Sequence, residues 1–512
     1  MTTPHPAPIA TALAALTADD LLRFVAKQRW FAGKGATPTD ARLVNSIVLP
    51  WGDGRFAVAR VIVTTGSGDA TYQIPMASSE SIPPGIEDRF VIRNATDGAG
   101  VYDAIQDPAF RAGLVSALAG GLVVRDHHSA WIIESLASGW LPAAHDIETS
   151  VGSAEQSNTS IGIGNVAILK LFRMLKPGIH PEVEVTQFLT ARAGFENTPR
   201  LLATIVFDDN GERTTAGMLQ VLLPGSTDAW SYALERGRPY FDAPIGRDAP
   251  NAFANDATRL GVVTRAMHDA LAGDDDDAAF APEVIAPEDL ERWAQRTQQS
   301  IREGLTLLER QIPSRAFPRD RIAEAEALVR RRDHYVGWID EIVDSVGDAA
   351  SEGARIRIHG DYHLGQVLRT PSGDFMIIDF EGEPSKSLEE RREKTSPLRD
   401  VAGMLRSIAY AAATLVMSVE KTIDLPTREL RAARWERDVR DAFLRGYLSD
   451  AGDADTRDDV AELFPDDEKQ VRQLLSLFET EKAFYELAYE LNNRPSWVWI
   501  PMRGIAKLFV TR

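Results

Sequence analysis

The order of hydrophobic and polar positions divides the chain into two parts of different character. Up to about residue 225, short apolar segments rich in β-branched residues alternate with breaks that contain glycine or proline, which is the pattern of strands. One segment with helical spacing interrupts them, at residues 103–118. The strand candidates are residues 55–64, 90–93, 122–125, 131–134, 166–172 and 218–223.

Beyond residue 226, apolar residues recur every three or four positions and predict long helices. These cover residues 254–271, 287–311, 320–346, 398–417, 427–448 and 468–492, with a short strand-and-turn insert at 355–383. A β-rich part followed by helices with one small β insert is the layout of a two-lobed, protein-kinase-like α+β fold. We expect an N-terminal β-rich cap at 1–110, an intermediate subdomain at 111–225 and a mostly helical lobe at 226–512.

Charge and composition exclude several classes of function. The 512 residues include 56 Lys and Arg against 75 Asp and Glu, a net charge of −19. Such a chain repels nucleic acid and anionic lipid, so a site for a polyphosphate needs local cations or a metal ion. There is no cysteine, which removes disulfides and thiolate chemistry. Without a secretory pattern or a long uninterrupted apolar run, we expect a cytoplasmic protein.

The β insert carries the most informative motif. Residues 359–366 read His-Gly-Asp-Tyr-His-Leu-Gly-Gln, and two apolar strands then flank a Pro-Ser-Gly turn at 371–373. Proline and glycine at these turn positions predict a hairpin. A hairpin brings its ends together, so Gln366 and Asp379 should lie side by side, with Asp361 on the loop before them.

These three residues fit phosphoryl transfer, in which the protein positions the groups and neutralises charge. Asp361 fits the base that accepts the proton of the attacking hydroxyl. Asp379 and Gln366 fit oxygen ligands of Mg²⁺. The alternative is a surface hairpin with scattered acids. His359 and His363 do not indicate a metal site, since no third ligand is evident; His359 is expected to support the loop, and His363 to be structural or to face substrate.

The phosphates of a nucleotide need a cation, and Lys170 is the candidate. It lies in the apolar strand at 166–172, where a lysine needs a counter-charge. Glu182 and Glu184 both lie on the first turn of the next predicted helix, and we favour Glu184. The alternative for Lys170 is an edge-strand residue whose ammonium reaches solvent.

The loop before that strand offers hydroxyl and amide groups. Its side chains and backbone N–H groups fit a cover over phosphates, although it has no glycine-rich consensus and a polar hairpin turn is an equal alternative. The candidates are Gln156, Ser157, Asn158, Thr159 and Ser160.

Together these segments resemble the bacterial maltokinases, which are relatives of aminoglycoside phosphotransferases. Nearly the full length is covered, and the catalytic and C-terminal motifs are the specific parts. The resemblance rests on residues 156–160, 169–173, 359–366, 378–384, 396–405 and 481–495, and on Arg-Trp-Phe-Ala-Gly-Lys at 29–34, which is similar to the N-terminal cap of the family.

The resemblance implies a reaction and its cofactors. A maltokinase transfers the γ-phosphate of ATP to the anomeric hydroxyl of maltose, giving maltose 1-phosphate for α-glucan (glycogen) synthesis, and depends on Mg²⁺. Members of the family associate with trehalose synthase, which makes that enzyme a possible partner of this chain.

The resemblance also places the sugar on the C-terminal helix. Lys482, Tyr485 and Tyr489 fall on one helix face, where two rings and an ammonium suit a disaccharide. We add His363 and Glu381, from the two catalytic motifs, to the candidate sugar-binding residues. The alternative for the tyrosines is core packing.

Two other functions stay open. Glucosamine kinases share this architecture and much of the catalytic loop, so the acceptor is an aminosugar in the alternative interpretation. In another class, the chain is a kinase-like scaffold that binds trehalose synthase. Scaffolds of that kind typically lack the base or the metal ligand, and Asp361, Gln366, Asp379 and Lys170 are all present.

Overall fold

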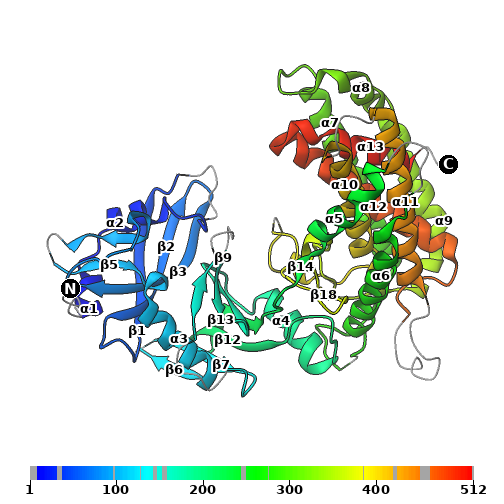
Figure 1. Cartoon of the computed structure of the whole chain (residues 1–512). Coiled ribbons are helices and arrows are strands. Elements are labelled where there is room, and N and C mark those ends of the chain that lie inside the picture. The colour runs from blue at the N-terminus through cyan, green and yellow to red at the C-terminus, as the bar shows by residue number, and fades with distance from the viewer. Residues whose placement is uncertain are drawn as a thin grey trace. The chain divides into compact units, whose positions relative to one another are not determined.

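The chain forms two compact units that divide near the change of sequence pattern. The computed structural model describes residues 8–31, 37–95, 98–126, 128–141, 147–152, 158–243, 249–274, 276–384, 386–418, 424–449 and 462–509. Unit 1 comprises Met1–Gln187 and Pro199–Pro224, and unit 2 comprises Phe188–Thr198 and Gly225–Arg512. Unit 1 holds the strands of two large sheets and unit 2 holds most of the helices (Figure 1). The predicted α+β class is confirmed.

The first sheet of unit 1 has the strand order β1-β2-β3-β5-β4, with β11 added beside β3. Helices α1 (Ile9–Ala14) and α2 (Ala18–Val25) share one apolar cluster with its strands. The strands are β1 (Asp40–Val48), β2 (Phe56–Thr65), β3 (Gly68–Ser79), β4 (Val91–Arg93), β5 (Gly100–Asp103) and β11 (Met174–Leu175).

The second sheet is antiparallel with the order β6-β7-β12-β13-β10-β9-β8. Helix α3 (Pro108–Gly120) packs on it; Asp107 caps its first turn and Gly121, at φ 76°, ends it. The segment predicted as a helix from residue 103 begins with a strand end instead. The strands are β6 (Leu122–Arg125), β7 (Ala130–Ser135), β8 (Thr149–Val151), β9 (Asn158–Ile163), β10 (Ala167–Phe172), β12 (Leu201–Asp209) and β13 (Glu212–Val221).

A buried arginine joins the elements of the two sheets. Arg173 follows β10 and is fully buried, with Nη2 2.7 Å from Asp103 Oδ2 at the end of β5. Its Nε donates to Thr159 Oγ1 at 2.8 Å, and its guanidinium lies 5.1 Å from the ring centre of Trp30. Trp30 therefore anchors the 29–34 motif in unit 1; Lys34 lies outside the described residues.

Unit 2 is built from nine long helices in its described part. Helices α6 and α11 cross at two glycines, Gly261 and Gly446, where a Cβ on either would collide with the backbone of the other helix. The helices are α5 (Ala229–Asp242), α6 (Ala252–Leu271), α7 (Pro287–Gln311), α8 (Ile322–Arg330), α9 (Arg332–Val346), α10 (Leu398–Ser418), α11 (Leu425–Leu448), α12 (Glu468–Asn493) and α13 (Trp499–Leu508).

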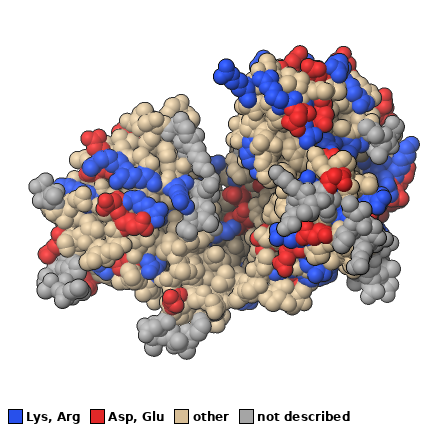
Figure 2. Space-filling model, turned by 45° about the horizontal axis from the view of Figure 1, so that its top comes forward, with Lys and Arg blue, Asp and Glu red and all other residues tan. Residues whose placement is uncertain are grey.

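Helix α10 is long and apolar enough to cross a membrane by length and composition, which the sequence pattern had not indicated. In the structure 67% of its most apolar window is buried inside unit 2, as in the core helix of a helical domain. Figure 2 shows basic and acidic side chains interspersed over the face in view.

Replacing Arg173 by methionine should destabilise unit 1. The change leaves the Asp103 carboxylate buried without its cation, which costs about 3 to 5 kcal/mol of unfolding free energy. Chemical denaturation of the wild type and Arg173→Met measures it. As a control, Arg89→Met removes the exposed pair with Glu87 and should cost under about 1 kcal/mol. Equal losses of unfolding free energy in Arg173→Met and Arg89→Met would contradict a larger contribution of the buried pair.

Candidate active site

The predicted hairpin is present in unit 2. Strands β17 (Val367–Arg369) and β18 (Phe375–Ile377) pair antiparallel, and Thr370 O accepts a hydrogen bond from Gly373 N at 3.0 Å across the turn. At the open end Gln366 O accepts from Ile378 N at 3.0 Å. The hairpin therefore brings the backbone of Gln366 beside the residue that precedes Asp379.

Asp379 has an unusual backbone conformation. Its φ is 70°, in the left-handed region that non-glycine residues rarely adopt. Such a conformation costs on the order of 1 kcal/mol and persists only where the surrounding structure holds it, which is common at functional sites. The strained backbone indicates that the structure holds the Asp379 side chain in one particular orientation.

Asp361 lies on the loop before the hairpin with 25% of its side chain exposed, so a ligand can reach it. Lys482 Nζ, from the distant helix α12, lies 3.9 Å from Asp361 Oδ1. His363 Nε2 lies 3.9 Å from Asp361 Oδ2. Three predicted site residues thus meet in one place.

The two histidines of the loop have different partners. His359 Nε2 lies 2.9 Å from Ile378 O and must donate to that carbonyl, so it supports the loop as expected. His363 Nδ1 accepts from Gly365 N at 3.0 Å, which puts the proton of the neutral ring on Nε2, facing Asp361. Burial lowers the pKa of His363, while Asp361 acts in the opposite direction, and the ring is neutral at pH 7.

One buried carboxylate holds the loop in place. Asp400, in the first turn of α10, accepts from His359 N at 2.7 Å and from Gly360 N at 2.9 Å. His268 Nε2 lies 3.2 Å from the same carboxylate. Burial by itself raises the pKa of a carboxyl group, but the hydrogen bonds and charges of its neighbours, His268 first, outweigh it and hold the pKa of Asp400 below its ordinary value.

Helix α10 contacts the loop along one face. A Cβ at Gly403 would lie 2.6 Å from Tyr362 O, and Ser407 Oγ accepts from Leu364 N at 3.1 Å. Together with Asp400 these residues are three and four positions apart, on one face of the helix. Sequence reasoning missed this role, although the motif at 396–405 contained the signal: an aspartate at the start of a long apolar helix.

The α12 residues predicted to bind sugar lie at the surface. Tyr485 is 39% exposed and Tyr489 46%, which excludes the core-packing alternative. Lys482 Nζ lies 5.0 Å from the centre of the Tyr485 ring. The glutamates of the same helix are held by arginines, in the pairs Arg399–Glu481 (2.9 Å), Arg406–Glu486 (2.7 Å) and Arg494–Glu490 (2.6 Å).

Glu381, the remaining candidate for sugar binding, follows Asp379 on the segment after β18. Its carboxylate Oε2 lies 3.7 Å from Arg391 Nη1, and its backbone carbonyl accepts from the same nitrogen at 3.1 Å. The side chain is thus held beside Arg391.

In unit 1, Lys170 has a partner of the predicted kind. Lys170 Nζ lies 2.5 Å from Glu182 Oε1, and Glu182 is buried on the first turn of α4 (Pro181–Gln187). The structure thus shows the pair with Glu182, the less favoured of the two candidates, and the role of Glu184 stays a prediction. Residues two positions apart point about 200° apart on a helix, and the first residues of α4 turn Glu182 toward the sheet.

The segment predicted as a phosphate-covering loop is described only from Asn158, and there it is strand β9, so the expectation of a loop is corrected for Asn158, Thr159 and Ser160. Gln156 and Ser157 lie outside the described residues. Ser160 pairs with Lys170, and Asn158 with Phe172, on the same face of the two strands. The expectation for Thr159 is corrected: its hydroxyl is buried and accepts from Arg173, on the opposite face from Lys170.

The donor set at the hairpin fits Mg²⁺. Asp379 carries a carboxylate and Gln366 an amide oxygen, which are the hard ligands that this ion prefers. Among the described residues no group of three or more His, Asp or Glu side chains is arranged to hold a metal ion. A bound Mg²⁺ would therefore take its other ligands from phosphate oxygens and water.

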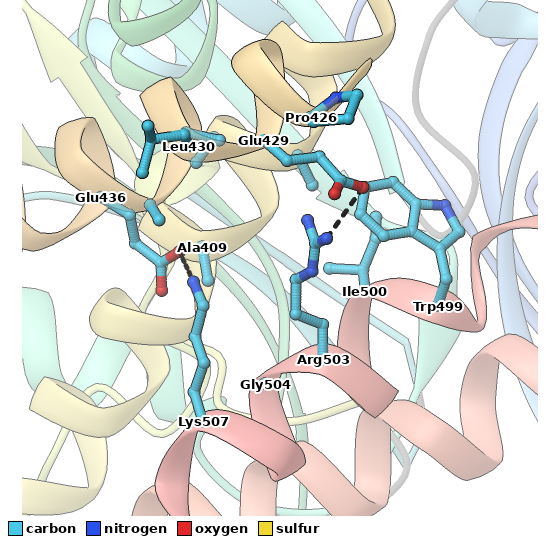
Figure 3. Close-up of a pocket in the computed structure, with 14 residues that line it drawn as sticks. Ala409, Pro426, Glu429, Leu430, Glu436, Trp499, Ile500, Arg503, Gly504 and Lys507 are labelled. Carbon is cyan, nitrogen blue, oxygen red and sulfur yellow. Dashed lines mark hydrogen bonds and ion pairs between the residues drawn. The ribbon is translucent and has the colours of Figure 1, made fainter. Parts of the chain in front are cut away.

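A pocket of about 360 Å³ elsewhere in unit 2 shares no residue with this site. It lies among α10, α11 and α13, and Figure 3 shows Arg503 directed at Glu429 and Lys507 at Glu436 across it. The Arg503–Glu429 distance is 2.8 Å. The rim charges are thus neutralised within the protein, and the catalytic motifs lie outside this pocket.

Replacing Asp400 by asparagine should change how stability depends on pH. The folded-state pKa of Asp400 lies below the unfolded value of about 3.9, so its contribution is complete above that pH and is lost as the pH falls through the folded-state pKa. We expect Asp400→Asn to lower the Tm at pH 7, because one N–H loses its acceptor, and to lose less further stability on acidification below about pH 4 than the wild type. Thermal unfolding of both proteins at a series of pH values measures the Tm. Parallel curves of Tm against pH for the wild type and Asp400→Asn would contradict the prediction.

The sequence is similar to one protein-family model and to two kinases. Residues 24–107 match the family model of the maltokinase N-terminal cap domain. The glucosamine kinase of Streptacidiphilus jiangxiensis is 25% identical over 492 residues, covering 93% of this chain and 99% of the relative. The glucosamine kinase of Mycolicibacterium smegmatis is 25% identical over 358 residues, 70% of this chain and 78% of the relative.

Solved structures show the same fold. A glucosamine kinase in complex with glucosamine, ADP and inorganic phosphate superposes with a TM-score of 0.67 at 22% identity, covering 99% of this chain and all of that one. Crystal form A of a glucosamine kinase superposes with a TM-score of 0.66 at 22% identity, covering 98% of this chain and 99% of that one. The chain therefore has the kinase-like α+β fold of these structures, with an N-terminal part similar to the maltokinase cap domain.

Proposed function

We propose that this protein transfers the γ-phosphate of ATP to a hydroxyl group of a sugar. The observation that carries the proposal is Asp361: an accessible carboxylate on a loop held by Asp400, beside a hairpin that presents Gln366 and Asp379. The fold shared with glucosamine kinases, one of them solved with ADP, supports it.

In this mechanism Asp361 accepts the proton of the sugar hydroxyl as the oxygen attacks phosphorus. Lys482, 3.9 Å away, hydrogen-bonds the sugar and orients the hydroxyl toward the carboxylate. His363, neutral with its proton on Nε2, lies 3.9 Å from Asp361 Oδ2 and donates to the sugar beside that carboxylate. Asp400 acts by keeping the backbone of this loop fixed.

For the nucleotide phosphates the proposal needs a metal ion with its oxygen ligands and a cationic side chain. Mg²⁺, when bound, would neutralise charge on the β- and γ-phosphates, and Gln366 and Asp379 would hold it. In unit 1, Lys170 supplies a cation whose direction Glu182 fixes through the 2.5 Å ion pair. Ser160, opposite Lys170 on β9, offers a hydroxyl on the same face.

Maltose is the acceptor that we propose, phosphorylated at its anomeric hydroxyl to maltose 1-phosphate for α-glucan synthesis. Exposed tyrosine rings on α12 suit the faces of glucose units. The glutamates of that helix are bound to arginines, so it offers a neutral sugar two rings and an ammonium and offers an aminosugar little negative charge. The cap-domain match supports the same assignment.

Glucosamine is the second candidate acceptor. The specific observation in its favour is that curated relatives aligned over most of the chain are named glucosamine kinase. The Lys482 ammonium beside Asp361 is unfavourable for an acceptor that is itself a cation. A scaffold that binds trehalose synthase is disfavoured, because the base and the proposed metal ligands are all retained.

A coupled ADP-release assay with ATP and Mg²⁺ tests the proposal across maltose, glucose, glucosamine and trehalose. Turnover with maltose in preference to the others supports the acceptor, and turnover with glucosamine keeps the mechanism but replaces the acceptor. Absence of turnover with every sugar, together with binding of trehalose synthase, would support the scaffold.

Asp361→Asn should abolish phosphorylation while leaving the fold and nucleotide binding intact. Loss of a general base lowers kcat by about 10²- to 10⁴-fold. Steady-state kinetics and calorimetric titration of ADP measure the two quantities separately. Near-normal turnover in this variant would overturn the assignment of the base.

Tyr485→Ala should raise the sugar KM with a smaller change in kcat. Loss of ring contact worth about 1 kcal/mol corresponds to about fivefold in affinity. Leu430→Ala, at a 54% exposed position on α11, serves as the control and should leave KM unchanged. An unchanged KM in Tyr485→Ala for the preferred sugar would exclude this face of α12 as the acceptor site.

A further inference from the structure

The segment that follows Asp379 wraps around one side chain, Arg391. This residue lies in the 3-10 helix Glu390–Arg392, and only 6% of its side chain is exposed. Each arm of its guanidinium is bound to a backbone carbonyl of the segment. The hydrogen bonds are Nη1 to Glu381 O at 3.1 Å, Nη2 to Pro384 O at 2.9 Å and Nε to Lys386 O at 3.1 Å.

The same side chain packs against a glycine that contacts the catalytic loop. Gly382 has φ 72°, and a Cβ there would lie 3.3 Å from Arg391 Cβ and Cγ. Gly382 also lies close to Gly360, where an added Cβ would be 3.2 Å from Gly382 Cα. Gly360 directly precedes Asp361. A continuous row of contacts therefore runs from Arg391 to the proposed base.

Asp379 depends on this arrangement because its backbone is strained. A left-handed aspartate is kept in place only if the chain is fixed on both sides. On the N-terminal side the β17–β18 ladder fixes it. On the C-terminal side Phe380 is buried with its ring centre 4.9 Å from that of His359, and Arg391 holds the following residues through the carbonyls and Gly382.

We infer that Arg391 is a positioning residue that sets the direction of Asp379 toward Mg²⁺ and aligns it with Asp361. The inference rests on the proposed function. Arginine is required because its planar group presents several donors in a fixed fork, whereas the lysine ammonium is a compact charge on a flexible stem. The positive charge alone therefore does not replace it.

Titration of ADP with and without Mg²⁺, by calorimetry, tests the inference on Arg391→Lys and Arg391→Gln. We expect the affinity for ADP alone to stay within about twofold of wild type, and the gain in affinity that Mg²⁺ provides to fall about tenfold, as for other residues that orient metal ligands. In steady-state assays kcat should fall by a similar factor, with a smaller change in the sugar KM. Lysine should not rescue either quantity.

Arg296→Gln is the matched control. Arg296 is a half-exposed arginine near the same segment, 3.4 Å from Glu393, and its replacement should leave both quantities unchanged. Should an Arg391 variant fail to fold, Ser387→Ala removes the exposed hydroxyl that accepts from Glu390 N at the start of the same 3-10 helix, and it should give a smaller change in the same direction.

Three results would overturn the inference: an unchanged Mg²⁺-dependent gain in Arg391→Lys, an equal loss of affinity with and without Mg²⁺, or no Mg²⁺-dependent gain in the wild type. Failure of the proposed function is distinguishable, since a wild type that binds ADP more tightly with Mg²⁺ but phosphorylates no sugar contradicts the reaction and still leaves the effect of Arg391 measurable.

Discussion

The catalytic segments of this protein depend on one buried carboxylate. Asp400 accepts from two consecutive backbone N–H groups, those of His359 and Gly360, and so fixes the direction in which the next residue, Asp361, leaves the loop. A buried carboxylate is stable only when its oxygens are satisfied, and here His268 together with the two N–H groups satisfies them. The loop and helix α10 are therefore held as one body.

The other contacts around the site extend this constraint. His359 joins the loop to the hairpin through Ile378 O, and Gly403 and Ser407 continue the contact along α10. The proposed reaction needs little covalent chemistry from the protein, so its demand is accurate placement of oxygen atoms. Rigid elements behind a short loop provide that placement better than an isolated loop would.

The charged residues of helix α12 are mostly paired within unit 2. The glutamates of α12 are bound by arginines, which leaves Lys482 as the cation near Asp361 and leaves the tyrosine rings at the surface. Such a surface recognises shape and hydroxyl groups more than charge. The proposal of a neutral sugar rather than an aminosugar as acceptor rests on this difference.

The sequence by itself determined the fold class, the hairpin and the residues that carry the proposed chemistry, because turn residues, strand periodicity and motif spacing are local properties. In unit 1 it missed the strands β1, β3, β5, β8, β9, β11 and β12. With β12 it missed the Asn210-Gly211 turn that leads into β13, where both residues adopt positive φ. Only the tertiary structure decided which glutamate pairs with Lys170, that Thr159 faces Arg173, and that Asp400 and Arg391 support the site. Each of these depends on which face of an element turns toward a neighbour far along the chain, and local spacing does not specify that.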